Sequence, residues 1–272
     1  MGTRPSEQSF FRLVPGDVNG FLGLAVDNLS VLALLAAVLI GAYGVPSDIV
    51  FGRMFPGTAL GVLVGDVIYT WLAVRLARRT GRSDVTAMPF GLDTPTTIGM
   101  ALLVLGPAFA KFRAAGLDPT AAGLETWYLG MAATVSMGVL KLILSFAGRT
   151  VRRMVPMAGL LGSLAGIALT LIGFFPMIDL LQFPIVGLLT LGLILYALVA
   201  KGSIPFRMPG VLFAVIVGTL FYYGVGQSGL FGMQIPAPTM PHFRLAFPHP
   251  DTGIFHGFAG LWDYLPLIIP FA

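Results

Sequence analysis

The chain has 272 residues, of which 56% are hydrophobic and only 10% are charged, and its formal net charge is +4. An ordinary soluble domain carries about 25% charged residues, so this composition excludes a soluble globular protein and an intrinsically disordered chain. The sequence contains no cysteine, which excludes thiol catalysis, disulfide scaffolds and cysteine-based zinc sites.

The first residues are polar and lack the short apolar core of a cleavable signal peptide, so residues 1–19 are predicted to be a cytoplasmic lead-in. Seven apolar stretches follow, each close to the ~20 residues that a helix needs to cross a bilayer. Helices are expected because backbone polar groups in lipid must be satisfied within the segment. The predicted spans are 20–43, 54–74, 87–109, 126–147, 155–175, 183–200 and 209–225.

The chain after the seventh span divides into two parts. Residues 226–260 are rich in proline and glycine and too polar to span, which predicts an extracytoplasmic loop. His242, His249 and His256 recur there every seven residues, but the prolines around them favour an exposed loop over a metal site. Residues 261–272 begin an apolar run of about ten residues, too short to cross. We expect the start of an eighth span in a trimmed chain, with an interfacial segment as the alternative.

The lysines and arginines predict the orientation. If the N-terminus is inside, only Arg53, Lys111, Arg113 and Arg244 of the 16 basic residues fall on the outer side, and the other 12 fall inside. The positive-inside rule therefore favours a cytoplasmic N-terminus. The clusters at 75–82 and 149–153 are interpreted as topology anchors, with a lipid-binding basic site as the alternative. Basic residues at span ends, rather than on one face, do not indicate a nucleic-acid partner.

The start of the third span cannot form a regular helix. Pro89 and Pro95 lack the backbone N–H, and each disfavours helix at the residue before it. We expect an extended segment over 87–91 and a half-helix from about Thr94, with Asp93 or Thr94 as its N-cap. Unwound backbone at membrane depth lines a cavity or is buried, and transporters bind substrates at such breaks. The alternative is a re-entrant loop near the cytoplasmic surface with Asp93 as a plain cap.

Two further carboxylates lie within spans, where an ionisable group costs at least about 2.5 kcal/mol. Asp27 is a candidate for substrate contact or proton transfer, or else a neutral carboxyl that bonds a neighbouring helix. Asn28 follows it, turned by about 100° on the helix, so one of the two is expected to face the site. Asp66 follows the glycines 57, 61 and 65, whose spacing predicts a helix-packing seam. We interpret Asp66, which lies next to that seam, as a structural residue that hydrogen-bonds a partner helix.

Several activities lack their motifs. The sequence has no His-Glu-x-x-His zinc motif, no Walker A loop and no Gly-x-Ser-x-Gly elbow, which disfavours an ATP-driven pump and a soluble-type hydrolase. The seventh predicted span contains no lysine for retinal. We therefore expect no enzymatic activity, and neither a metal nor another cofactor.

With these residues in view, the chain resembles the N-terminal half of a xanthine/uracil permease-family protein, a nucleobase–cation symporter. It is most similar to the hypoxanthine/guanine permease branch. Three stretches carry the resemblance: the opening of the first span at 17–25, Ala-Met-Pro-Phe-Gly-Leu-Asp at 87–93, and Trp-Asp-Tyr-Leu-Pro-Leu at 262–267. Asp93 stands where that branch has asparagine, and the family's glutamate in the eighth span and its tenth-span motif would lie beyond Ala272.

The resemblance implies an all-α polytopic membrane protein of two inverted seven-span repeats, with a broken third span. Residues 20–147 would hold spans one to four of the core, and residues 148–225 would hold spans five to seven of the gate. The substrate would meet Phe90, Gly91, Asp93 and Thr94, with Phe90 stacking on it, and Asp27 and Asn28 would line the same cavity. Asp27 and Asp93 are the candidates for proton coupling.

The resemblance further implies a bacterial inner membrane, a homodimer through the gate, and a small polar heterocycle such as a purine or uracil as substrate. The coupling ion would be a proton, with sodium as the alternative. Two alternatives for the whole function stay open. One is an anion transporter of the sulfate/bicarbonate type, which shares this fold. The other is a complete seven-span receptor or scaffold.

Overall fold

The computed structural model describes residues 15–82, 84–154, 156–205, 208–229, 235, 246–248 and 251–269. Over these ranges all regular secondary structure is helical, and there is no strand. The predictions for residues 1–14, for His242 and His249, and for Arg244 lie outside the described residues.

Within the described residues, five helical segments are long and apolar enough to cross a membrane, which confirms the prediction of a helical membrane protein. They match five of the predicted spans, but several are longer than predicted. The second begins at Ser47 instead of 54 and continues to Thr80, because α2 (Ser47–Ile49), η2 (Val50–Met54) and α3 (Phe55–Thr80) run on without a break. The five segments are Gly20–Ala42, Ser47–Thr80, Thr94–Ala114, Pro119–Gly148 and Gly210–Ser228.

The other two predicted spans are helical but are not among these five. The predicted span 155–175 corresponds to α7 (Met157–Ile167), η4 (Ala168–Phe174) and α8 (Phe175–Gln182). The predicted span 183–200 is α9 (Pro184–Leu198), an apolar helix of 15 residues. Pro184 in its first turn and the non-helical Phe183 before it separate α9 from α8.

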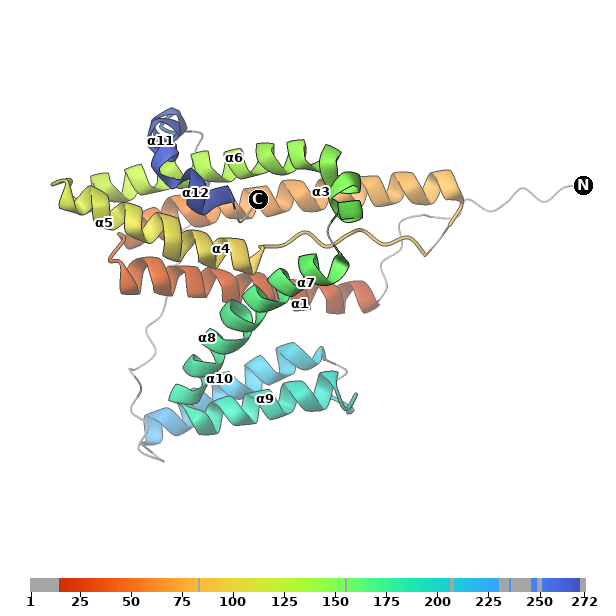
Figure 1. The fold of residues 1–272 in the computed structure, drawn as a ribbon. Helices are drawn as coiled ribbons and strands as arrows, with labels where there is room; N and C mark the ends of the chain where they lie inside the picture. Colours follow the sequence, from red (N-terminus) through yellow and green to blue (C-terminus); the bar gives the residue numbers. More distant parts are fainter. Residues whose placement is uncertain are drawn as a thin grey trace, which may run out of the picture.

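Most helices run back and forth along one direction, whereas α7 and α8 run obliquely to it (Figure 1). One layer contains α1 (Pro15–Ala36) with its continuation η1 (Ala37–Ala42), α3, α6 (Pro119–Met154), and the run of α4 (Thr94–Met100), η3 (Ala101–Leu105) and α5 (Gly106–Ala114). The second layer is the pair of α9 and α10 (Gly210–Ser228), with α10 also touching α1. The start of α1 and the C-terminal ends of α3 and α6 lie at the same end of the molecule (Figure 1).

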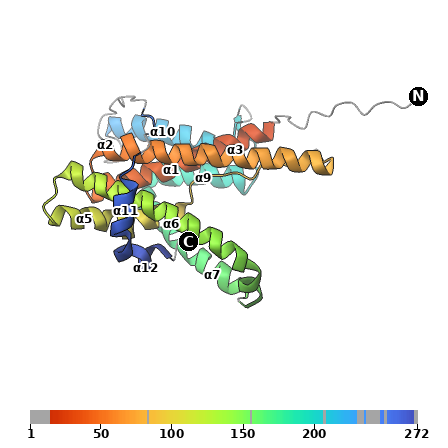
Figure 2. The same ribbon diagram turned by 90° about the horizontal axis from the view of Figure 1, so that it is seen from above.

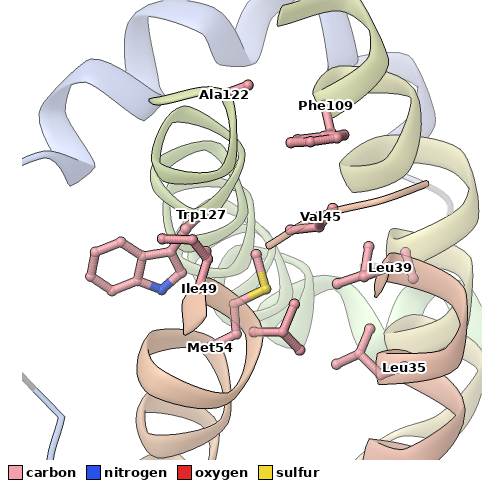
Figure 3. Close-up of a cluster of buried hydrophobic side chains, with 10 residues drawn as sticks. Leu35, Leu39, Val45, Ile49, Met54, Phe109, Ala122 and Trp127 are labelled. Carbon is pink, nitrogen blue, oxygen red and sulfur yellow. The ribbon is translucent and has the colours of Figure 1, made fainter. Parts of the chain in front are cut away.

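The core forms where four chain segments meet, at the end of the molecule opposite the start of α1. Its side chains come from α1 and η1, from α2 and η2, from α5 and from α6. Most of those labelled gather between these segments, whereas the Trp127 ring lies at the edge of the group (Figure 3). Leu39, Val50 and Ala122 are completely buried. The labelled members of this cluster are Leu35, Leu39, Val45, Ile49, Met54, Phe109, Ala122 and Trp127.

Residues 251–269, called the strap below, differ from their prediction. The predicted loop 226–260 ends in a helix, α11 (Ile254–Gly260), and α10 extends into its start. The predicted eighth-span start consists of a 3-10 turn, Leu261–Tyr264, and α12 (Leu265–Ile268). α11 lies across α6 in both views (Figures 1 and 2), and Leu261, Tyr264 and Ile268 are buried in a second apolar cluster with α5, α6 and η3.

Candidate functional site

A break in helical structure precedes the half-helix that begins the third span. Residues 84–93 have no regular secondary structure and run between α3 and α1 to the start of α4 (Figure 1). Asp93 is the N-cap of α4, with extended backbone at φ −78° and ψ 102°, and Pro95 lies in the first turn. The predicted break and the predicted helix start at Thr94 are both confirmed. The cause is local, since neither proline supplies a backbone donor and each favours extended backbone before it.

Two polar side chains, one from each neighbouring helix, hold this segment in place. The Phe90 N–H donates to Oδ1 of Asp66 on α3 at 3.3 Å, and the Leu92 N–H donates to Oδ1 of Asn28 on α1 at 2.7 Å. Backbone donors outside a helix need hydrogen-bond partners, and these two side chains supply them. The structural interpretation of Asp66 is therefore supported, although its partner is the unwound segment and not another helix.

Glycines allow the segment to approach both helices closely. A Cβ on Gly91 would lie 2.8 Å from Cδ1 of Leu24 and 3.0 Å from Oδ1 of Asn28. A Cβ on Gly65 of α3 would overlap the ring of Phe90. The Phe90 ring also lies 5.7 Å from the ring of Tyr69, tilted by 31°. Phe90 is thus backed by α3 on one side, while 37% of its surface stays exposed.

The glycine spacing on α3 therefore has a different use from the one predicted. A Cβ on Gly57 or Gly61 meets nothing within 4 Å among the described residues, so these two glycines form no packing seam here. Gly65 alone of the three is in close contact, and its neighbour is the aromatic ring of the break. Sequence spacing identified the small residues but could not show which one an aromatic side chain would cover.

Asp93 and Thr94 lie where the sequence placed them, at the start of the half-helix. The Asp93 carbonyl accepts the Thr97 N–H at 2.8 Å, which is the first hydrogen bond of the helix. The Asp93 carboxylate accepts a hydrogen bond from the Thr96 hydroxyl. Asp93 is exposed and Thr94 is half-buried. The carboxylate makes no capping hydrogen bond to the backbone N–H groups of the half-helix.

Asp27 precedes Asn28 on α1, but within the described residues its side chain makes no hydrogen bond to the segment. Its side chain is exposed, while its backbone carbonyl accepts the Ser30 hydroxyl at 2.7 Å. Asn28, its neighbour, is the residue that faces the segment, as the angle between successive side chains on a helix allows. The structure therefore brings Asn28, Phe90 and Gly91 together with Asp66. The predicted roles of Asp27 and Asp93 in binding or proton transfer stay predictions.

The entry to the break carries an ion pair. Arg82 donates two hydrogen bonds to the carboxylate of Asp84, at 2.9 and 2.8 Å. These bonds lower the pKa of Asp84, mainly because the guanidinium donates to the charged form. Both side chains are well exposed, so the pair contributes little to stability.

Sequence reasoning missed two residues of this site, Gly65 and Tyr69, and assigned Asp66 to another partner. A carboxylate inside a span was a signal for Asp66, but nothing in the sequence connects Tyr69 with Phe90. Comparison of the chain with protein families, with curated proteins and with solved structures gives no match. The function proposed below therefore depends on the residues at the break.

Proposed function

We propose that the protein is a secondary active transporter of a nucleobase, such as a purine or uracil, coupled to proton movement. One observation carries the proposal: the unwound segment 84–93 between two membrane helices, ending in a half-helix capped by Asp93. Discontinuous helices supply backbone polar groups at membrane depth, which continuous helices cannot offer to a substrate.

The chemistry of the break suits a flat polar ring. Phe90 is supported from behind by Gly65 and Tyr69 and keeps an exposed side, so its ring can stack on a heterocycle. The carboxylate of Asp93 can accept the ring N–H groups of a base. A negative charge at the start of the half-helix also disfavours an anionic substrate, because it already offsets the positive helix end.

Proton coupling would use a carboxylate that changes its protonation state during transport. Asp93 and Asp27 are the two proposed carriers, because each lies in or beside a membrane span, where ionisable groups usually serve function. We further propose a bacterial inner membrane, a cytoplasmic N-terminus, and pairing of two copies, all of which follow from the resemblance and the charge distribution.

Uptake measurements on cells that lack their own nucleobase permeases test the proposal. We expect cells expressing the protein to accumulate radiolabelled hypoxanthine, guanine, xanthine or uracil, and an uncoupler that dissipates the proton gradient should abolish accumulation. Replacing sodium with choline in the medium decides whether sodium is the coupling ion instead. If none of these bases accumulates in cells with confirmed surface expression, nucleobase transport is ruled out.

Three variants separate the role of Asp93 from general damage. Asp93→Ala should lose at least about tenfold in uptake, equivalent to about 1.4 kcal/mol of lost transition-state stabilisation. Asp93→Asn keeps an oxygen acceptor but no proton site, so it should bind the base without proton-driven accumulation. Asp84→Asn is the matched control, an exposed carboxylate on the same segment, and should transport like the wild type. Normal accumulation by Asp93→Ala would exclude Asp93 from the site.

A further inference from the structure

The C-terminal end of α3 carries a face of arginines beside a tryptophan. Trp71, Arg75 and Arg78 are spaced by four and three residues, so they lie on one side of the helix, and Arg79 follows Arg75 by one turn. With Val74, these side chains line a shallow hollow on α3 alone. The Arg75 guanidinium lies over the Trp71 ring, 5.2 Å from its centre. This end of α3 extends beyond the helices beside it (Figures 1 and 2).

The length of the helix places this face at the membrane surface. The continuous segment Ser47–Thr80 has 34 residues. At 1.5 Å per residue it is about 50 Å long, against a hydrocarbon thickness of about 30 Å. Its apolar part ends near 74, so the arginines reach the level of the phosphates. Trp71 is 57% exposed, at the level where tryptophan is enriched between headgroups and hydrocarbon.

These arginines have more charge than the protein itself neutralises. Within the described residues, no carboxylate pairs with Arg75, Arg78 or Arg79, whereas Arg82 just beyond them is paired with Asp84 at 2.8 Å. The dipole at a helix C-terminus is worth only about half a negative charge. Roughly two and a half positive charges therefore remain for an external partner. Guanidinium groups match phosphate oxygens in geometry and charge.

We propose that Trp71, Arg75, Arg78 and Arg79 form a binding site for the phosphate headgroup of an anionic phospholipid. The arginines bind the phosphate, and Trp71 holds Arg75 in position and contacts the upper part of the acyl chains. The site is independent of the transport function proposed above, because it needs only that α3 spans the membrane.

Native mass spectrometry of the full chain, released from bilayers that contain equal amounts of phosphatidylglycerol and phosphatidylcholine, tests the site. We expect preferential retention of phosphatidylglycerol. Each arginine near the surface contributes about 1 kcal/mol, or about a fivefold preference, so Arg75→Gln/Arg78→Gln/Arg79→Gln should lose it. Arg82→Gln is the matched control and should keep the preference, since Arg82 is already neutralised. Equal retention of both lipids by the wild type, or full preference in the triple variant, would overturn the proposal.

A second measurement distinguishes lipid binding from a role in topology alone. The chain contains no cysteine, so Ser203→Cys, at an exposed position of the same end, reports sidedness without background. Loss of phosphatidylglycerol with unchanged accessibility of the introduced thiol supports the site. If the triple variant inserts in the opposite orientation, the test is the salt dependence of lipid retention by the wild type. Arginines bind a phosphate electrostatically, so the preference of the wild type for phosphatidylglycerol must fall as salt is raised. A preference that does not change with salt would contradict the proposal.

Discussion

At the scale of single residues, glycines control how closely the unwound segment approaches its neighbours. The Phe90 ring occupies the space that a Cβ on Gly65 would fill. Asn28 and Leu24 occupy the space that a Cβ on Gly91 would need. Asn28 and Asp66 then bind the two backbone N–H groups on either side of Gly91. The position of Phe90 therefore depends on residues of two helices that are far from it in sequence.

Replacing Gly65 with alanine should displace Phe90, because the new Cβ would overlap its ring. We expect a loss of about 1–3 kcal/mol in stability from overpacking and a clear rise in the KM of uptake. Gly61→Ala, one turn earlier, is the matched control. Its Cβ meets open space, so it should leave uptake unchanged and stabilise α3 by about 0.5–1 kcal/mol. Thermal unfolding in detergent and uptake kinetics measure both effects, and equal behaviour of the two variants would contradict this role of Gly65.

At the scale of elements, polar contacts fix the strap to the rest of the molecule on both sides of α11. Asp251 accepts hydrogen bonds from Arg53 at 3.0 Å and from the Tyr128 hydroxyl at 3.2 Å. On the other side of α11, Lys111 pairs with Asp263 at 2.8 Å. Between these anchors α11 lies directly on the backbone of α6. The strap thus connects the start of the second span with the end of the third and the first part of the fourth.

The close contact of α11 with α6 requires glycine at 257. A Cβ there would overlap the backbone carbonyl of Tyr128, which cannot move without bending α6. We predict that Gly257→Ala lifts the strap and exposes it to hydrogen exchange and proteolysis, at a cost of about 1–3 kcal/mol. Gly260→Ala, on the same helix with nothing within 4 Å of its Cβ, should remain protected. Full protection in Gly257→Ala would show that the contact is looser than described.

Attachment of the strap should also depend on pH in the acid range. The pKa of Asp251 is lowered from 3.8, chiefly by the Gly253 N–H and further by Tyr128 and Arg53. A carboxylate with a lowered pKa contributes stability that is complete above its unfolded value and is lost as the pH falls through the folded one. We therefore expect protection of residues 254–268 from hydrogen exchange to be constant near neutrality and to fall below about pH 4. Asp251→Asn should be less protected at neutral pH and should lack this acid transition.

At the scale of the whole molecule, the alternating helices put the basic ends of α3 and α6 on the same side as the start of α1 (Figure 1). The positive-inside rule predicts that this side is the cytoplasmic one. Single cysteines in the cysteine-free chain can test the assignment. A membrane-impermeant thiol reagent should label Ser47→Cys in intact cells, and it should label Ser203→Cys only after permeabilisation. The reverse pattern would place the N-terminus outside.

The sequence by itself determined the membrane class, the approximate helices and the break before Thr94. These follow from local causes, namely apolar length, the missing donors of Pro89 and Pro95, and the preference of Asp93 for an N-cap. The lengths of the helices were less predictable, since α3 and α6 continue through polar residues beyond the apolar runs that marked the predicted spans.

Only the tertiary structure decided which side chains meet at the break. The sequence placed Asn28, Phe90, Gly91, Asp93 and Thr94 near the site. It assigned Gly65 to a helix-packing seam, gave Asp66 a partner helix, and left Tyr69 without a role. The structure likewise turned part of a predicted loop into the strap. Each of these contacts joins segments that are distant in sequence, and their partners depend on how whole helices pack, which no local pattern encodes.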